Sequence, residues 1–371
     1  MGGITSSQSQ SGYMPQLDGL RALSVIAVMY THFLKEKYWL FDVYWGGIGV
    51  RCFFVLSGFL ITGILLRENA RIDHRSGSRL TLIRQFYIRR YLRLTPVFIA
   101  TLLLAAIINI PNTRETFWWH VIYLSNFNFA ISNSWQGAVS HFWTLAVEEQ
   151  FYLIWPFFIL LIPVKALIRV ICLIIPLVLV YRLTAHSLGA NDILVWVMLP
   201  DSMDALCSGA LVAILVRYCG LKSTQKASLV VAGICLTFWI YLQVFDLSGY
   251  LHSLNLGATA IAVFFAWLIL HASEGHSGVL GRVLTLPALT FIGKISYGIY
   301  VLHNFVFYVL VFHMPNFKSL NPVLMAVLGG LATMTIASLS WFLLEKPINN
   351  FRHSINYHPH TNCQKPRKTL V

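Results

Sequence analysis

The sequence LDGLRALSVIAVMYTHFLKEK, residues 17–37, has the length and apolar content of a helix that crosses a membrane, yet it carries an arginine near one end and a histidine near the other. Arg21 and His32 are eleven residues apart, so they differ by about 20° around a helix and by roughly 16 Å along its axis. Ionisable side chains inside a membrane are costly, and they normally face a protein or water-filled interior. One helix face is therefore expected to present a guanidinium and an imidazole at two depths. The alternative is a snorkelling arginine and a structural histidine.

The composition excludes an ordinary soluble domain. Hydrophobic residues make up 57% of the 371 positions and charged residues 11%, and the mean hydropathy is +0.67, whereas soluble domains carry about a quarter charged residues. The net charge of +13 lies beside apolar segments, which favours a topology signal and gives no reason to expect a nucleic-acid partner. The six cysteines show no ligand spacing, so neither a metal site nor a disulfide framework is expected.

Apolar segments predict an all-α polytopic membrane protein with about ten transmembrane helices. The segments lie at residues 17–35, 46–66, 91–110, 142–162, 170–184, 199–216, 228–245, 255–272, 290–312 and 322–344. Pro176 is expected to interrupt the fifth segment, and Arg182 is counted among the basic residues on the outer side. Most of the 27 lysines and arginines fall on one side of this topology, which predicts cytoplasmic termini and a multi-pass protein of the inner (plasma) membrane.

Three regions are expected along the chain. Residues 1–16 are polar and lack the basic start of a signal peptide, so they form a cytoplasmic N-terminus. Residues 17–344 form the membrane domain, and residues 345–371 form a basic cytoplasmic tail. Glu345 marks the exit of the last helix, and no separate soluble domain is expected at either end.

The opening motif LDGLRA, with its histidine eleven positions after the arginine, is followed by further motifs along nearly the whole chain. These are GVRCFFVLSGFLIT (49–62), FYIRRYLRLTP (86–96), HFWTLAVEEQFYLIWP (141–156), MDALCSGAL (203–211), FIGKISYGIYVLH (291–303) and LEKP (344–347). In this order they resemble the integral-membrane acyltransferase-3 family. The resemblance implies an enzyme that O-acylates sugars or other hydroxyl compounds.

Three arginines are candidates for the acyl-donor site. Arg90 and Arg93 are three residues apart and so point from one side of a helix, and guanidinium groups suit phosphate. By resemblance they match the family's R-x-x-R motif, which is associated with acyl-CoA. With Arg21 they are expected to bind the CoA head, and the roughly 16 Å from Arg21 to His32 is comparable to an extended pantetheine arm. Acetyl-CoA is the expected co-substrate, with no permanently bound cofactor. The alternative is anchoring at the inner leaflet.

His32 is the candidate general base. His141 and Glu148 are seven residues apart, so they share a helix face with Thr144 between them. Glu148 is expected about 10 Å below His141, near the depth of His32, where a carboxylate would orient the imidazole. His141 and Thr144 are assigned to the acceptor side. The family usually has serine at Thr144 and H-T-W in place of this chain's H-F-W, which alters the pocket lining.

Other motif residues have open or structural assignments. Asp204 either caps a helix or contacts the acceptor. Arg51 is expected at the lipid headgroups rather than against an anionic acceptor, and the small residues around Gly58 are expected to allow close helix packing. Tyr297 and His303 match a family motif without an assigned role.

These patterns predict a membrane O-acyltransferase, expected to be an O-acetyltransferase, that moves an acyl group from cytoplasmic acyl-CoA to a cell-surface carbohydrate or its lipid-linked precursor. Its expected partners are acyl-CoA, this acceptor and membrane lipid. One alternative is a small lipophilic acceptor such as a macrolide. The other is a polytopic transporter, which would be favoured by repeat symmetry and broken helices that the sequence does not display.

Overall fold

The structure is a computed structural model. It describes residues 13–34, 40, 43–75, 78–218, 225–245, 255–275 and 277–354. Within these ranges the chain is helical and contains no β-strand, which confirms the predicted all-α class.

Ten helices of eighteen or more residues occur in these ranges and correspond in order to the ten apolar segments. They are α1 (Pro15–Phe33), α2 (Trp45–Arg75), α3 (Arg79–Ile107), α6 (Phe142–Leu161), α7 (Val164–Ser187), α9 (Leu199–Tyr218), α10 (Gln225–Val244), α12 (Leu256–Ser273), α15 (Ser296–His313) and α16 (Pro322–Ser340). The shorter elements are α4 (Phe117–Val121), α5 (Ser125–Ser132), η3 (Gly137–Val139), α8 (Asp192–Val197), α13 (Val279–Leu284), α14 (Pro287–Lys294), η5 (Phe317–Ser319), η6 (Trp341–Glu345) and α17 (Lys346–Ser354).

Eight helices among the described residues are long and apolar enough to cross a membrane. The other two long helices are α1, which contains Asp18 and Arg21, and α10. The chain is therefore an integral membrane protein, as predicted. The count of ten spans and the cytoplasmic location of both termini stay predictions.

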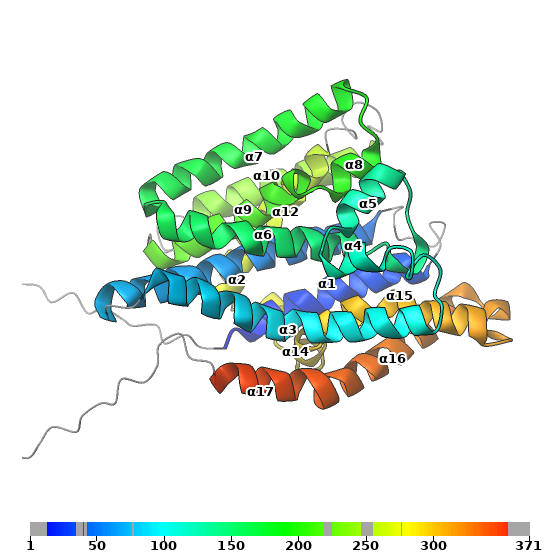
Figure 1. The fold of residues 1–371 in the computed structure, drawn as a ribbon. Coiled ribbons are helices and arrows are strands. Elements are labelled where there is room, and N and C mark those ends of the chain that lie inside the picture. The colour runs from blue at the N-terminus through cyan, green and yellow to red at the C-terminus, as the bar shows by residue number, and fades with distance from the viewer. Residues whose placement is uncertain are drawn as a thin grey trace, which may run out of the picture.

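The helix α1 lies in the interior of the bundle. Pro15 occupies its first turn, where the missing N–H costs nothing, and Asp18 follows near the positive end of the helix dipole. The helix packs against α2, α14 and α15. In Figure 1, α1 and α2 lie between α7 at one edge and α16 and α17 at the other, and the short helices α4, α5 and α8 gather at one end. The polar side chains of α1 therefore have neighbouring helices on several sides.

The packing of α2 on α9 depends on two glycines. A Cβ atom on Gly58 would lie 1.9 Å from the carbonyl oxygen of Leu206, and one on Gly209 would lie 1.9 Å from that of Val55. No larger side chain fits such an approach of two backbones. This finding confirms the close packing that was predicted for the segment around Gly58.

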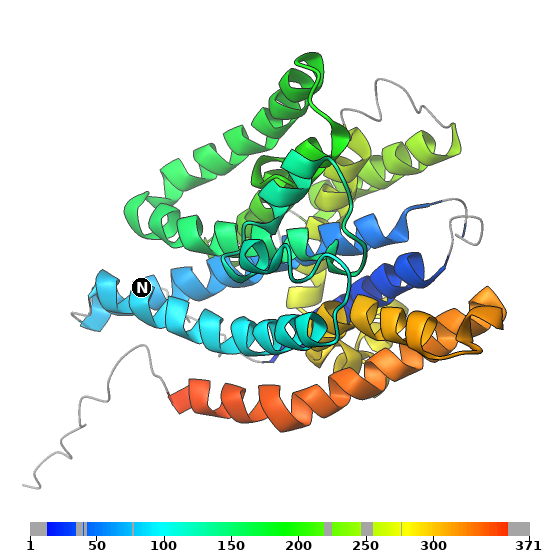
Figure 2. The same cartoon turned by 45° about the vertical axis from the view of Figure 1, so that its right-hand side comes forward.

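Two helix boundaries differ from the prediction. Pro176 lies inside α7, which continues unbroken over 24 residues, because a helix in a membrane tolerates proline when its freed carbonyl group is satisfied locally. The last span also continues past Glu345, through the π-helical turn η6 into α17. In Figure 2 this orange-to-red helix runs as one curved rod along the bundle. Glu345 therefore lies within a helix rather than at its exit, and residues 355–371 of the expected tail lie outside the described residues.

Candidate active site

Two cavities occupy the centre of the bundle, and they share part of their walls. The large cavity has a volume of about 920 Å³ and the small cavity about 160 Å³. Val50, Thr144 and Tyr300 line both of them. The two cavities are therefore neighbours that meet at these three side chains.

The first helix contributes to both cavities through one face. Arg21 lines the small cavity, and His32 lines the large one and is exposed to it. Arg21 also forms an ion pair with Asp18, one turn earlier in α1. Both side chains face the interior, as the helix periodicity predicted, but each lines a different cavity.

The helix α6 repeats this arrangement. His141, the residue before its first turn, lines the large cavity, Thr144 lines both cavities, and Glu148 lines the small one. The Thr144 and Tyr300 hydroxyls lie 2.5 Å apart, and they lie within hydrogen-bond distance of the His141 carbonyl oxygen, at 2.9 Å and 3.1 Å. These two hydroxyl groups tie α6 to α15 at the wall between the cavities.

The small cavity gathers the predicted donor-site arginines. Arg21, Arg90 and Arg93 line it together with Lys294. The Arg90 guanidinium lies 5.0 Å from the ring centre of Tyr152, a contact that holds the planar group in place. Four cationic side chains around one cavity create an attractive environment for phosphate groups.

Glu148 does not meet His32. Its carboxylate accepts hydrogen bonds from the Ser57 hydroxyl at 2.7 Å and from the Tyr152 hydroxyl at 3.2 Å, in the small cavity. The His32 ring instead lies against His303 and the carbonyl oxygen of Val28. The predicted pairing of His32 with Glu148 is thus absent, because Glu148 lines the small cavity and His32 lines the large one.

Three imidazoles cluster beside the large cavity. The Nε2 atom of His303 lies 3.1 Å from Nδ1 of His32, and the ring centres of His303 and His141 are 4.7 Å apart. His303 is completely buried. Within the described ranges no group of three or more histidine, cysteine or acidic side chains is placed to hold a metal ion.

A buried network of four charges includes Arg51 and Asp201, which line the large cavity. Arg51 contacts Asp201 at 2.5 Å and Asp204 at 2.8 Å, and Arg182 contacts the same two carboxylates at 2.6 Å and 3.0 Å. Arg182 is fully buried, and Arg51 is nearly so. The prediction that Arg51 lies at the headgroups is therefore wrong, and Arg182, which was counted among the basic residues on the outer side, is buried inside the bundle.

Asp204 is occupied by this network. It is fully buried, and it also accepts hydrogen bonds from the Thr259 hydroxyl at 2.6 Å and the Ala205 amide at 2.7 Å. Asp204 does not line the large cavity, so it cannot contact an acceptor bound there. Asp201 does line the cavity. Sequence reasoning missed Asp201, although its position three residues before Asp204 puts both on one helix face.

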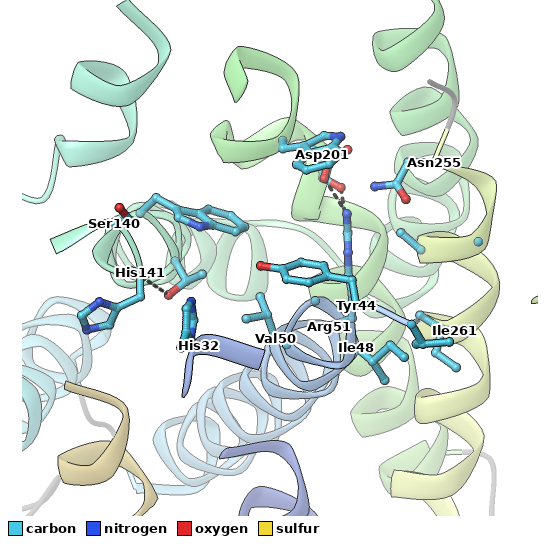
Figure 3. A pocket seen from close by; sticks show the side chains of 18 of the residues that line it. His32, Tyr44, Ile48, Val50, Arg51, Ser140, His141, Asp201, Asn255 and Ile261 are labelled. Carbon is cyan, nitrogen blue, oxygen red and sulfur yellow. Dashed lines mark hydrogen bonds and ion pairs between the residues drawn. The ribbon is translucent and has the colours of Figure 1, made fainter. Parts of the chain in front are cut away.

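Aromatic side chains from separate elements surround the large cavity. Figure 3 shows His32 and His141 on one side of it, Arg51, Asp201 and Asn255 on the other, and Tyr44 between them. The remaining aromatic and amide side chains of the lining are Trp135, Trp143, Trp196, Trp239, Gln243 and Asn304. Flat apolar faces with a few polar groups among them are typical of a site for an organic ligand.

The chain belongs to the acyltransferase-3 family, because the family model described as an acyltransferase domain matches residues 14–342. The chain is therefore a membrane protein with an acyltransferase domain of this family. It is similar to the peptidoglycan O-acetyltransferase OatA of Listeria monocytogenes, with 29% identity over 93% of this chain and 57% of that protein. It is also similar to the O-acetyltransferase OatA of Staphylococcus aureus, with 26% identity over 91% of this chain and 57% of that protein. The chain thus spans less than two thirds of the length of these relatives, and no solved structure matches it.

Proposed function

We propose that the protein transfers an acyl group, expected to be acetyl, from cytoplasmic acyl-CoA to a hydroxyl group of a cell-surface carbohydrate or its lipid-linked precursor, and that it acts in the plasma membrane. The observation that carries this proposal is the wall of Val50, Thr144 and Tyr300 shared by the two cavities. A cavity rich in arginine lies on one side of this wall and a cavity lined by aromatic residues on the other.

The small cavity is the proposed donor site. Arg21, Arg90 and Arg93 bind the phosphates of acyl-CoA at its mouth, and the pantetheine arm extends toward Thr144. The thioester then lies at the shared wall. This arrangement needs only the thin arm, and not the charged head, to enter the bundle.

The large cavity is the proposed acceptor site. Its volume of about 920 Å³ is at the upper end of the range of about 300–1,000 Å³ for ligand pockets, so it has room for more than one sugar unit. Tryptophan faces pack against the C–H faces of sugar rings, and the amides of Gln243, Asn255 and Asn304 supply hydrogen bonds to hydroxyl groups. The relative from Listeria, named as a peptidoglycan O-acetyltransferase, supports a cell-wall glycan as the acceptor.

His32 is the proposed general base. Its imidazole takes the proton of the acceptor hydroxyl as the oxygen attacks the thioester carbonyl carbon. The new C–O bond forms, the C–S bond breaks, and CoA leaves as the thiol after it accepts a proton. This step requires a base that is exposed to the cavity in which the acceptor is bound. His32 is exposed and lines the large cavity.

Purified protein in detergent should release CoA thiol from acetyl-CoA only when an acceptor is present, and without a membrane gradient. Soluble peptidoglycan fragments, a chitooligosaccharide and a macrolide are the acceptors to compare. His32→Gln should lower the rate by about 10²- to 10⁴-fold while expression and membrane insertion persist. Acetylation of the macrolide alone would replace the carbohydrate acceptor. No release of CoA with any acceptor, together with solute movement in proteoliposomes, would favour a transporter.

A further inference from the structure

His303 is a buried imidazole that lies behind the proposed base. It comes from α15, it has no exposed surface, and it lines neither cavity. It therefore touches neither the acyl group nor the acceptor. Its Nε2 atom nevertheless lies 3.1 Å from Nδ1 of His32.

The proton of a neutral His303 can be assigned from its own surroundings. Its Nδ1 atom lies 2.7 Å from the carbonyl oxygen of Tyr300. A carbonyl oxygen only accepts hydrogen bonds, so Nδ1 carries the proton and donates it. The Nε2 atom of the neutral ring then has a lone pair, and this lone pair points to His32.

The proton of His32 follows from the same reasoning. Its Nδ1 atom lies 3.0 Å from the carbonyl oxygen of Val28 and 3.1 Å from Nε2 of His303. Both of these partners are acceptors, so Nδ1 of His32 carries the proton. Both hydrogen bonds that this ring makes within the described part of the chain use Nδ1. Its Nε2 atom keeps the lone pair that a base needs.

We propose that His303 is a positioning residue that holds His32 in the Nδ1–H tautomer, so that Nε2 of His32 is the atom that takes the proton of the acceptor hydroxyl. This inference rests on the proposed role of His32 as the base. When Nε2 of His32 gains that proton, its Nδ1–H still donates to Nε2 of His303 and to the Val28 carbonyl oxygen. The positive charge is thereby shared with two fixed acceptors.

The arrangement performs with a neutral side chain what a carboxylate performs in the Ser-His-Asp triad, where loss of the correct tautomer costs about 10⁴ in kcat. A neutral partner avoids a second ionised group in the membrane interior, where a carboxylate is costly. It also explains why the base does not need Glu148, which has its own partners in the small cavity.

Two substitutions at His303 separate its positioning role from a role in packing. His303→Phe keeps an aromatic ring but removes the acceptor atom, and His303→Gln keeps an acceptor in the side-chain carbonyl group. We expect His303→Phe to lower kcat by about 10- to 100-fold with the KM for acetyl-CoA unchanged, because only part of the general-base contribution is lost. We expect His303→Gln to recover a measurable part of kcat. His313→Phe, the same change in the exposed last turn of α15, is the matched control and should keep the wild-type kcat.

Nitrogen NMR of protein labelled with ¹⁵N-histidine reads the tautomer without any need for turnover. The wild type should show His32, assigned by its loss in His32→Gln, as the Nδ1–H form, and His303→Phe should give a mixture of tautomers. A wild-type His32 protonated at Nε2, or an His303→Phe variant with unchanged tautomer and kcat, would overturn the inference. If the wild type shows the Nδ1–H form but never releases CoA, the proposed function fails and the assignment of the tautomer stands.

Discussion

The hydroxyl groups of Thr144 and Tyr300 lie 2.5 Å apart at the wall that separates the arginine-lined cavity from the aromatic one. One residue comes from α6 and the other from α15, and both hydroxyls also reach the same carbonyl oxygen of His141. Any acyl group that passes between the cavities moves beside this pair. The position of the pair makes it the natural place to test whether the two cavities act as one site.

Thr144→Val removes the hydroxyl while it keeps the side-chain volume. The Tyr300 hydroxyl then keeps the His141 carbonyl oxygen but loses one hydrogen-bond partner, and one hydrogen bond is worth about 0.5–1.5 kcal/mol. We expect kcat for acceptor-dependent CoA release to fall by about two- to tenfold, because 1.4 kcal/mol corresponds to a factor of ten. Thr144→Ser, which keeps the hydroxyl, is the control and should stay near wild type. Equal rates for the valine and serine variants would show that the pair has no part in the reaction.

The arginines of the small cavity should act on the donor. Neutralising Arg21, Arg90 or Arg93 removes a charge-assisted hydrogen bond of about 1.5–3 kcal/mol, so the KM for acetyl-CoA should rise roughly tenfold or more for each. Lysine should restore Arg21 or Arg93 only in part, because it keeps the charge but not the fork of donors. The measurement is initial-rate kinetics with varied acetyl-CoA.

Arg71→Gln supplies the matched control for the arginine series. Arg71 is largely exposed and pairs with Glu68 within α2, so its loss should leave the donor KM unchanged. Wild-type donor KM values in all three cavity variants would move the CoA site elsewhere while leaving the acyltransferase activity in place.

Trp239 tests the acceptor side of the large cavity. It lines that cavity from α10, so Trp239→Ala should raise the acceptor KM by up to about tenfold, since one aromatic contact is worth about 0.5–1.5 kcal/mol beyond its buried area. The donor KM should not change. Trp118→Ala is the comparison, because that side chain is 71% exposed and lies outside the cavity. An acceptor KM that is insensitive to Trp239 would place the sugar outside this cavity.

Arg182 tests the buried charge network. Arg182→Met leaves Asp201 and Asp204 with one cation instead of two, and breaking a buried ion pair in this way costs about 3–5 kcal/mol. We expect a clearly lower midpoint of thermal unfolding in detergent, measured by the reaction of a fluorescent dye with the buried thiols of Cys52 and Cys207. Arg217→Met, a change at an exposed position of α9, should leave the midpoint unchanged. A wild-type midpoint for Arg182→Met would mean that the network contributes little to stability.

The sequence predicted which helix faces line the site. The spacing between Arg21 and His32, and between His141, Thr144 and Glu148, was sufficient because helical periodicity alone decides which residues share a face. All five of these side chains line one or both cavities.

The sequence did not predict which partners meet across helices. The rise per residue gave the depth of Glu148 along α6 but not its neighbours Ser57 and Tyr152. His303 had no predicted role because the His32 ring, the partner of its Nε2 atom, comes within reach only when α1 and α15 are packed together.

The burial of Arg51 and Arg182 was not predicted from the sequence, for a related reason. The positive-inside rule assigns a cation near a helix end to a loop, and it takes no account of a carboxylate on another helix. Arg182 is 19 residues from Asp201 and 22 from Asp204 in the chain, and its burial is explained by its contacts with these two carboxylates.

The four-charge network also constrains how the chain can be assembled by the ribosome and the translocon. Arg51 emerges 150 residues before Asp201, its partner on α9, an interval of roughly 8 to 30 seconds at about 5–20 residues per second. During that interval Arg51 on α2 has no carboxylate partner on α9, and exposing an unpaired arginine to lipid is costly. The same cost applies to Arg182 once α7 has been synthesised and before α9 follows. We therefore expect these two arginines to stay in a hydrated or protein-lined environment until α9 arrives, when the two aspartates make the four-charge network neutral.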